Sequence, residues 1–197
     1  MRWMLLGMLF SVSGCFFGQD GDKPGEAVGS FEAEGAMVVQ SCGGAIPAPD
    51  PLDLPFDLRL EPSGRAYWLG SNGKMLVGIE KDGVYTFQVG QSWTVIEPNR
   101  AQGYVGCSVT QLDELTFELE TAELEAEADA GVGPEPDSGA DAGVEPTVLT
   151  LSGSQTTEIV PVAGSDCVPA VSNQEGSFNA LPCRIEYLVT GTGIAAE

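Results

Sequence analysis

Most of the chain after residue 30 consists of short segments in which apolar and polar residues alternate with a period of two. This spacing is typical of β-strands that bury one face, because successive side chains of a strand point to opposite sides of the sheet. The clearest examples are residues 56–61, 85–89, 105–109, 115–120 and 183–189. About ten such strands predict an all-β fold, either an antiparallel sandwich or a small barrel.

Turn sequences separate the segments in the middle of the chain. Asn72-Gly73 and Asp82-Gly83 are strong hairpin signals, because both dipeptides favour the tight two-residue turns that join antiparallel strands. The sequence therefore predicts that four segments pair in chain order as a meander. They are residues 66–70, 74–80, 83–89 and 92–97.

An acidic stretch interrupts this pattern. Residues 113–145 contain twelve Asp and Glu residues and no Lys or Arg, and the motif ADAGV occurs in them twice. Segments rich in Ala, Gly, Pro and acids bury too little apolar surface to offset the entropy of ordering, so we expect a disordered insert at about residues 121–146. The insert is either a linker between two domains or a loop within one. Residues 147–197, which follow it, number about 50 and would be only marginally stable alone, which favours a single β domain over residues 31–197.

The charge and composition exclude several function classes. The formal net charge is −21 and the chain contains no histidine. A nucleic-acid partner is excluded, because binding it needs a basic surface that releases counterions. Serine and cysteine hydrolases that depend on histidine are excluded as well. The sequence predicts no catalytic residue, no cofactor and no metal ligand.

Four cysteines outside the N-terminal region indicate disulfides. Cys42, Cys107, Cys167 and Cys183 form an even set without the closely spaced pairs of a zinc site, so two disulfides are expected in an exported chain. Three pairings are open. Proximity in sequence alone favours Cys167 with Cys183 and Cys42 with Cys107.

The N-terminus has the order of an export signal. Arg2 precedes an apolar run at residues 3–10, which is too short to cross a bilayer, and small residues follow it. The next residues, Val12-Ser13-Gly14-Cys15, resemble the lipobox of bacterial lipoproteins. An ordinary signal peptide with a chance cysteine is the alternative.

The resemblance implies a cellular location for the protein. Residues 1–14 would be removed as a signal peptide and Cys15 would be lipidated. Independently of the resemblance, the composition of residues 15–30, rich in Gly and polar residues, predicts a flexible tether. Two or more acyl chains anchor a protein stably. Phe16 stands where an aspartate would favour the inner membrane, so the resemblance implies the outer membrane, with the protein facing the periplasm or the cell exterior.

These features favour a non-enzymatic role, either binding or structural, at the cell envelope. Tyr67, Trp68 and Trp93 are candidate ligand contacts, although core packing is the commoner role of such aromatics. The expected partners are the membrane, through acylated Cys15, and an unidentified protein or glycan. The alternative function is a hydrolase that uses two carboxylates to cleave glycans. Calcium binding by the acidic segment is a further hypothesis, because carboxylate oxygens are suitable calcium ligands, although disordered acidic segments more commonly screen cations loosely.

Overall fold

The computed structural model describes residues 23–121, 146–171 and 178–196. The predicted signal peptide, Cys15 and nearly all of the predicted acidic insert lie outside the described residues. In the described part of the chain, no helix is long and apolar enough to span a membrane.

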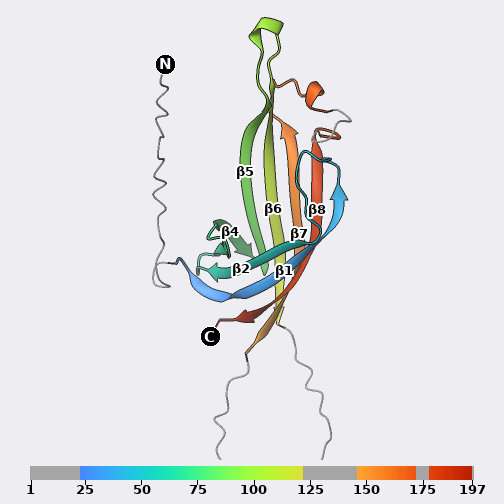
Figure 1. Ribbon diagram of the computed structural model, residues 1–197. Coiled ribbons are helices and arrows are strands. Elements are labelled where there is room, and N and C mark those ends of the chain that lie inside the picture. The colour runs from blue at the N-terminus through green and yellow to red at the C-terminus, as the bar shows by residue number, and fades with distance from the viewer. Residues whose placement is uncertain (1–22, 122–145, 172–177, 197) are drawn as a thin grey trace, which may run out of the picture.

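Eight antiparallel strands form a closed barrel in which each strand pairs with its neighbours in sequence (Figure 1). Pairing between the first strand and the last closes it, from Gly29 opposite Ala195 to Gln40 opposite Ile185. The strands are β1 (Glu26–Gln40), β2 (Leu52–Leu60), β3 (Arg65–Gly70), β4 (Met75–Lys81), β5 (Val84–Ile96), β6 (Cys107–Thr121), β7 (Val148–Pro161) and β8 (Cys183–Ala195).

The all-β prediction is confirmed, but the sandwich alternative and the number of about ten strands were wrong. Two pairs of predicted segments are in fact single long strands. Residues 83–89 and 92–97 lie together in β5, and residues 105–109 and 115–120 lie together in β6. The polar residues between these segments continue the extended backbone instead of turning it. In addition, β1 begins at Glu26, before the predicted start of the β domain at residue 31.

The predicted hairpin between β4 and β5 has the expected geometry. Lys81 pairs with Val84, which leaves Asp82 and Gly83 as a two-residue loop. Both loop residues have positive φ, 55° and 85°, as this turn requires. Glycine at the second position adopts that backbone without steric cost.

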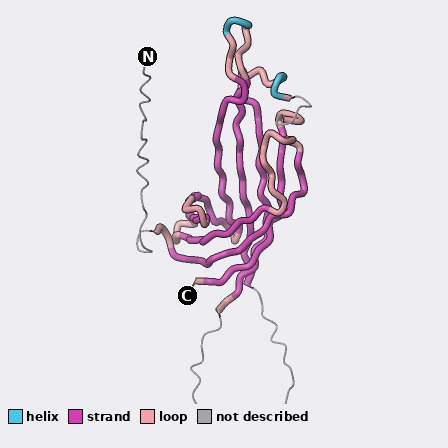
Figure 2. Tube along the Cα trace, viewed as in Figure 1, coloured by secondary structure: helices cyan, strands magenta, loops and turns pink. Residues whose placement is uncertain are grey.

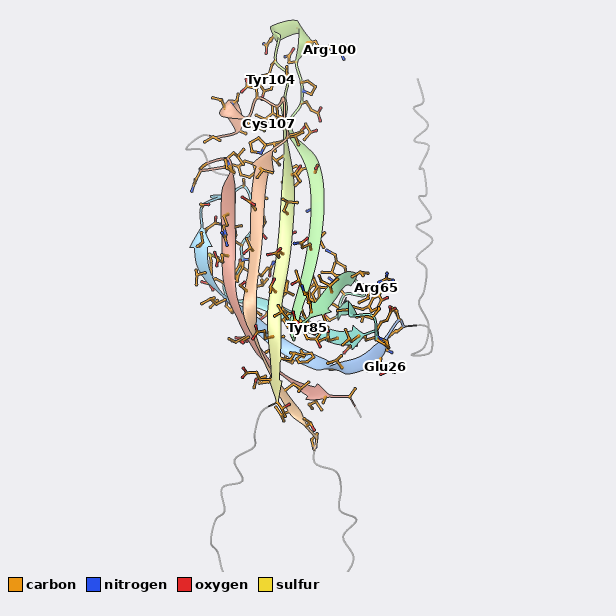
Figure 3. The ribbon with its side chains drawn as sticks, turned by 180° about the vertical axis from the view of Figure 1, so that it is seen from behind. Glu26, Arg65, Tyr85, Arg100, Tyr104 and Cys107 are labelled. Atoms are coloured by element: carbon orange, nitrogen blue, oxygen red, sulfur yellow. A yellow bond between two sulfur atoms is a disulfide. The ribbon has the colours of Figure 1, made fainter. Side chains whose placement is uncertain are left out.

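Aromatic side chains fill one end of the barrel. Phe117 is 1% exposed and stacks on Tyr85, with ring centroids 5.2 Å apart, and on Phe87, at 6.1 Å. Phe31 and Phe56 stack on the opposite wall at 5.2 Å. An eight-stranded barrel has an interior just wide enough for side chains to fill it, which these rings do. Figure 3 places Tyr85 toward this end and Cys107 at the opposite end.

The strands are unequal in length, so the barrel is complete over only part of its height. The ladder between β4 and β5 ends at the pair Gly78 and Phe87, and β1 pairs with β2 only as far as Gly35. Beyond these points β5, β6, β7, β8 and β1 continue as a curved sheet (Figure 2). Residues 41–51, between β1 and β2, return along this sheet, where the Tyr187 hydroxyl donates to the Pro49 carbonyl at 2.9 Å.

Two disulfides join loops and strands at the open end of the barrel. Cys42 is bonded to Cys183 and Cys107 to Cys167. The existence of two disulfides is confirmed, but the pairing guessed from sequence proximity was wrong. The topology explains why: Cys42 follows the end of β1, which lies beside the start of β8 at Cys183. Likewise Cys107 starts β6, beside the end of β7, and Cys167 follows soon after.

Candidate functional site

A cavity of about 280 Å³ lies where the closed barrel gives way to the curved sheet. Its walls come from β2 to β8 and from the loop at residues 41–51. The lining is mixed, with apolar side chains on most sides and a group of polar side chains on β6 and β7. The apolar and aromatic lining residues include Ile46, Leu52, Leu54, Trp68, Leu76, Phe87, Val89, Leu115, Ile185 and Tyr187.

The polar wall is a connected set of hydrogen bonds. The Thr157 hydroxyl donates to Asp113 Oδ1 at 2.6 Å, and Gln111 Nε2 donates to the same carboxylate, at 2.9 Å to Oδ1 and 2.7 Å to Oδ2. Gln91 Nε2 in turn donates to Gln111 Oε1 at 3.3 Å. Thr157 is 7% exposed. Such networks fix side-chain positions, because each buried polar group needs a partner.

Two buried polar atoms of cavity-lining residues have no hydrogen-bond partner within the described part of the chain. They are Trp68 Nε1, a donor, and Gln155 Oε1, an acceptor. A buried polar group that stays unpaired costs about 1–3 kcal/mol. The Trp68 indole approaches Phe56 edge-on, with centroids 5.6 Å apart, so the aromatic end of the barrel supports it.

Tyr187 connects the cavity to the loop at residues 41–51. Its side chain lines the cavity, and its hydroxyl donates to Pro49, also a lining residue. Burial, and then the negative charge of Asp50, raise the pKa of Tyr187. The phenol therefore remains a neutral hydrogen-bond donor at physiological pH and holds the loop in place.

The three aromatics singled out from the sequence have different surroundings. Trp68 lines the cavity. Tyr67 faces the other side of β3, where its hydroxyl donates to Glu61 Oε1, and it is not among the lining residues. Trp93 packs against the core in the upper part of β5, also outside the cavity lining. Cys15 lies outside the described residues.

The polar wall was not predicted from the sequence. Gln111 and Asp113 lie between two predicted strand segments, residues 105–109 and 115–120. Apolar residues are missing at these two positions, which indicated a break between two strands. In the structure they continue the inward-facing row of β6, between Val109 and Leu115. One feature of the sequence could have revealed this. The apolar residues on both sides of the interruption occupy the same alternate positions, as they do when a single strand continues. The phase is preserved here because positions 109, 111, 113 and 115 are all odd.

Comparison with known proteins yields no relative. No family model, no curated protein and no solved structure matches the chain. The function therefore has to be inferred from the chemistry of the cavity and of the N-terminal sequence. Among the described residues, no group of three or more carboxylate or cysteine side chains is arranged to hold a metal ion.

Proposed function

We propose that this protein is an outer-membrane lipoprotein with a non-enzymatic binding role, and that it holds a small, mostly apolar molecule in the barrel cavity. The observation that carries the binding role is the pair of unpaired atoms, Trp68 Nε1 and Gln155 Oε1, on residues of a mixed lining in which Gln111, Asp113 and Thr157 are hydrogen-bonded to one another. Ligand sites typically combine apolar walls with a few polar groups that fix orientation.

The chemistry of the lining defines the ligand class. A donor and an acceptor without partners suit a group that can both accept and donate, such as a hydroxyl or a primary amide. The apolar walls and the small volume suit a single ring or a short branched chain. Asp113 accepts three hydrogen bonds from neutral protein side chains, which fix the position of its carboxylate on the polar wall.

Binding is a better account of the cavity than glycan hydrolysis. A glycosidase needs two carboxylates about 5–9.5 Å apart that flank the substrate. Asp113 and Glu114 both border the cavity, but they are adjacent in β6 and their side chains point to opposite faces of the strand. Glu114 accepts a hydrogen bond from Gln88, whereas Asp113 is bonded to Thr157.

The binding proposal is tested with small aromatic alcohols and amides, with p-cresol as the first probe. Ligand-observed NMR detects binding, and substitutions locate it. Leu76→Trp fills the cavity and should abolish binding. Val77→Trp, one residue along β4 with a side chain 51% exposed, is the matched control and should bind normally. Trp68→Phe retains a ring but removes the donor, and should weaken binding about fivefold, since one hydrogen bond contributes about 1 kcal/mol.

Two results would count against this function. One is the absence of binding across the probe set at millimolar concentration. The other is binding that Leu76→Trp leaves unchanged, which would place the probe elsewhere on the protein. In either case the cavity would be a packing defect rather than a site.

The address is tested by the intact mass of the protein from membranes of the native host. A mass equal to residues 15–197 plus acyl chains supports lipidation of Cys15, and Cys15→Ser should release the protein from the membrane. A soluble chain that retains residues 1–14 would contradict the lipoprotein assignment but would leave the binding test unaffected.

A further inference from the structure

One edge of β5 is uncovered along most of the strand. From Gln88 to Ile96, β5 pairs with β6 only, because its ladder with β4 ends at Phe87. Figure 1 shows β5 at one margin of the long strands. Within the described residues, no other strand pairs with this edge. A free strand edge presents alternate N–H and C=O groups that can pair with an added strand.

The composition of this edge is unusual for a chain of this charge. Residues 88–96 contain no charged residue and no proline, although the net charge of the chain is −21. Natural proteins commonly protect exposed edges with lysine, proline or inward-pointing charges. None of these devices occurs at residues 88–96, so this edge is chemically open to strand addition.

The cavity opens at the point where β4 and β5 separate. Gly78 and Phe87 form their last pair, and a continued ladder would place Leu76 opposite Val89. Instead, this pair is not formed, and Leu76 and Val89 both line the cavity. A strand added to the edge of β5 would enter this wedge, and its residue opposite Val89 would direct its side chain to the cavity.

We propose that the natural ligand is an extended segment of another protein, which adds as a strand to the β5 edge and inserts one side chain into the cavity. This inference rests on the proposed function, because the side chain uses the same cavity. Tyrosine fits best, since it has an apolar ring and a hydroxyl that can accept from Trp68 Nε1 and donate to Gln155 Oε1.

Charge favours a neutral or basic partner over a second copy of this chain. Two copies, each with a net charge of −21, repel one another. Glu97 directly follows the uncharged edge, so Lys or Arg at that end of a peptide would meet an opposite charge. The partner segment is therefore expected to have an uncharged centre with one tyrosine, and a basic residue at the end that lies beside Glu97.

The test uses nine-residue peptides selected from a random display library against the full-length protein. We expect enriched peptides to be proline-free at the centre and to share one tyrosine or a similar aromatic residue. Each is then synthesised with single backbone N-methyl groups. Methylation at alternate positions should weaken binding about tenfold, while methylation at the positions between them should have little effect, because only alternate N–H groups face the partner strand.

Two further measurements locate the peptide. Hydrogen exchange should slow at residues 88–96 when the peptide binds. Val89→Lys, which places a charge on the inward face of the edge, should weaken peptide binding. Val77→Lys on the exposed face of β4 is the control. The N-methyl series needs no protein variant, so the test holds even if Val89→Lys fails to fold.

The outcomes separate this inference from the proposed function. If p-cresol binds in the cavity but no peptide binds, the proposal of strand addition is wrong and the cavity site stands. The same holds if p-cresol binds and the affinity of the peptide does not depend on which backbone nitrogen is methylated. If neither probe binds, both proposals fail. If the protein alone forms dimers that protect residues 88–96, the occupant of the edge is a second copy and the partner proposed here is wrong.

Discussion

The two disulfides differ in the length of chain that they close, which leads to a quantitative prediction. Cys42 and Cys183 are 141 residues apart, whereas Cys107 and Cys167 are 60 residues apart. A disulfide stabilises mainly by restricting the unfolded chain, and the effect grows with the logarithm of the loop length. For separations of 141 and 60 residues the chain-entropy relation gives about 5 and about 4.3 kcal/mol.

The perturbation is the replacement of each pair by alanine. All four sulfur-bearing side chains are buried, so the loss of packing is similar in the two variants and their difference reports loop length. Urea unfolding, followed by circular dichroism without reductant, should give a free energy of unfolding about 0.8 kcal/mol lower for the Cys42/Cys183 variant than for the Cys107/Cys167 variant. Equal losses, or a larger loss for the Cys107/Cys167 variant, would refute the entropic reasoning.

The pairing itself can be checked on the unmodified protein. Cleavage after glutamate separates all four cysteines, because Glu residues lie between each of them, at positions that include 61, 114 and 175. Without reduction, the peptide that contains Cys42 should remain linked to that of Cys183, and Cys107 to Cys167. Any other pair of linked peptides would contradict the topology, since the register of β8 against β1 and β7 fixes which cysteines can meet.

Three other predictions concern the barrel. Hydrogen bonding to Glu61 for Tyr67, and burial for the other three tyrosines, raise the pKa above the usual value. The contribution of these tyrosines to the free energy of unfolding should therefore be fully present below about pH 10 and fall as the pH rises through their folded-state pKa values, with phenolate absorbance at 295 nm appearing above pH 10. Gly78→Ala should destabilise the fold by more than 1 kcal/mol in urea unfolding, because a Cβ would lie 2.3 Å from the Thr86 carbonyl oxygen. Gly90→Ala, with its nearest contact at 3.4 Å, should be tolerated. Thr157→Val should lower the free energy of unfolding by about 1–3 kcal/mol, because it removes the hydrogen bond that buried Thr157 donates to Asp113; an unchanged midpoint would show that this bond contributes nothing.

Local features of the fold were predictable from the sequence, and features set by distant pairing were not. Alternation located most strands, and Asp82-Gly83 located a hairpin, because both signals act within a few residues. Alternation is the same in a sandwich and in a barrel. What decides between them is the pairing of β1 with β8, which joins opposite ends of the sequence and has no local signature. The prediction of the disulfide pairing was wrong for the same reason, because residues distant in sequence decide which cysteines meet.

The candidate site was only partly predictable. Trp68 was recognised because aromatics are uncommon and conspicuous. Gln111 and Asp113 fall between two predicted strand segments, because polar residues that face a barrel interior resemble loop residues in a sequence. Their role depends on Thr157, which is distant in sequence and reaches Asp113 only through the register of β6 and β7.

The closure of the barrel makes the starting point of the chain arbitrary. The backbone N–H of Ala196 donates to the Val28 carbonyl at 3.0 Å, so the two ends of the ordered barrel already touch. At the same end of the barrel, Thr121 pairs with Leu149, so the last residues of β6 lie beside the first residues of β7. A circular permutant that links 196 to 26 and begins at 146 would have every strand pairing intact, with β1 and β8 now a hairpin. The seam of the barrel would move to β6 and β7. The cavity, which lies farther along the barrel where β4 and β5 separate, would be unaltered.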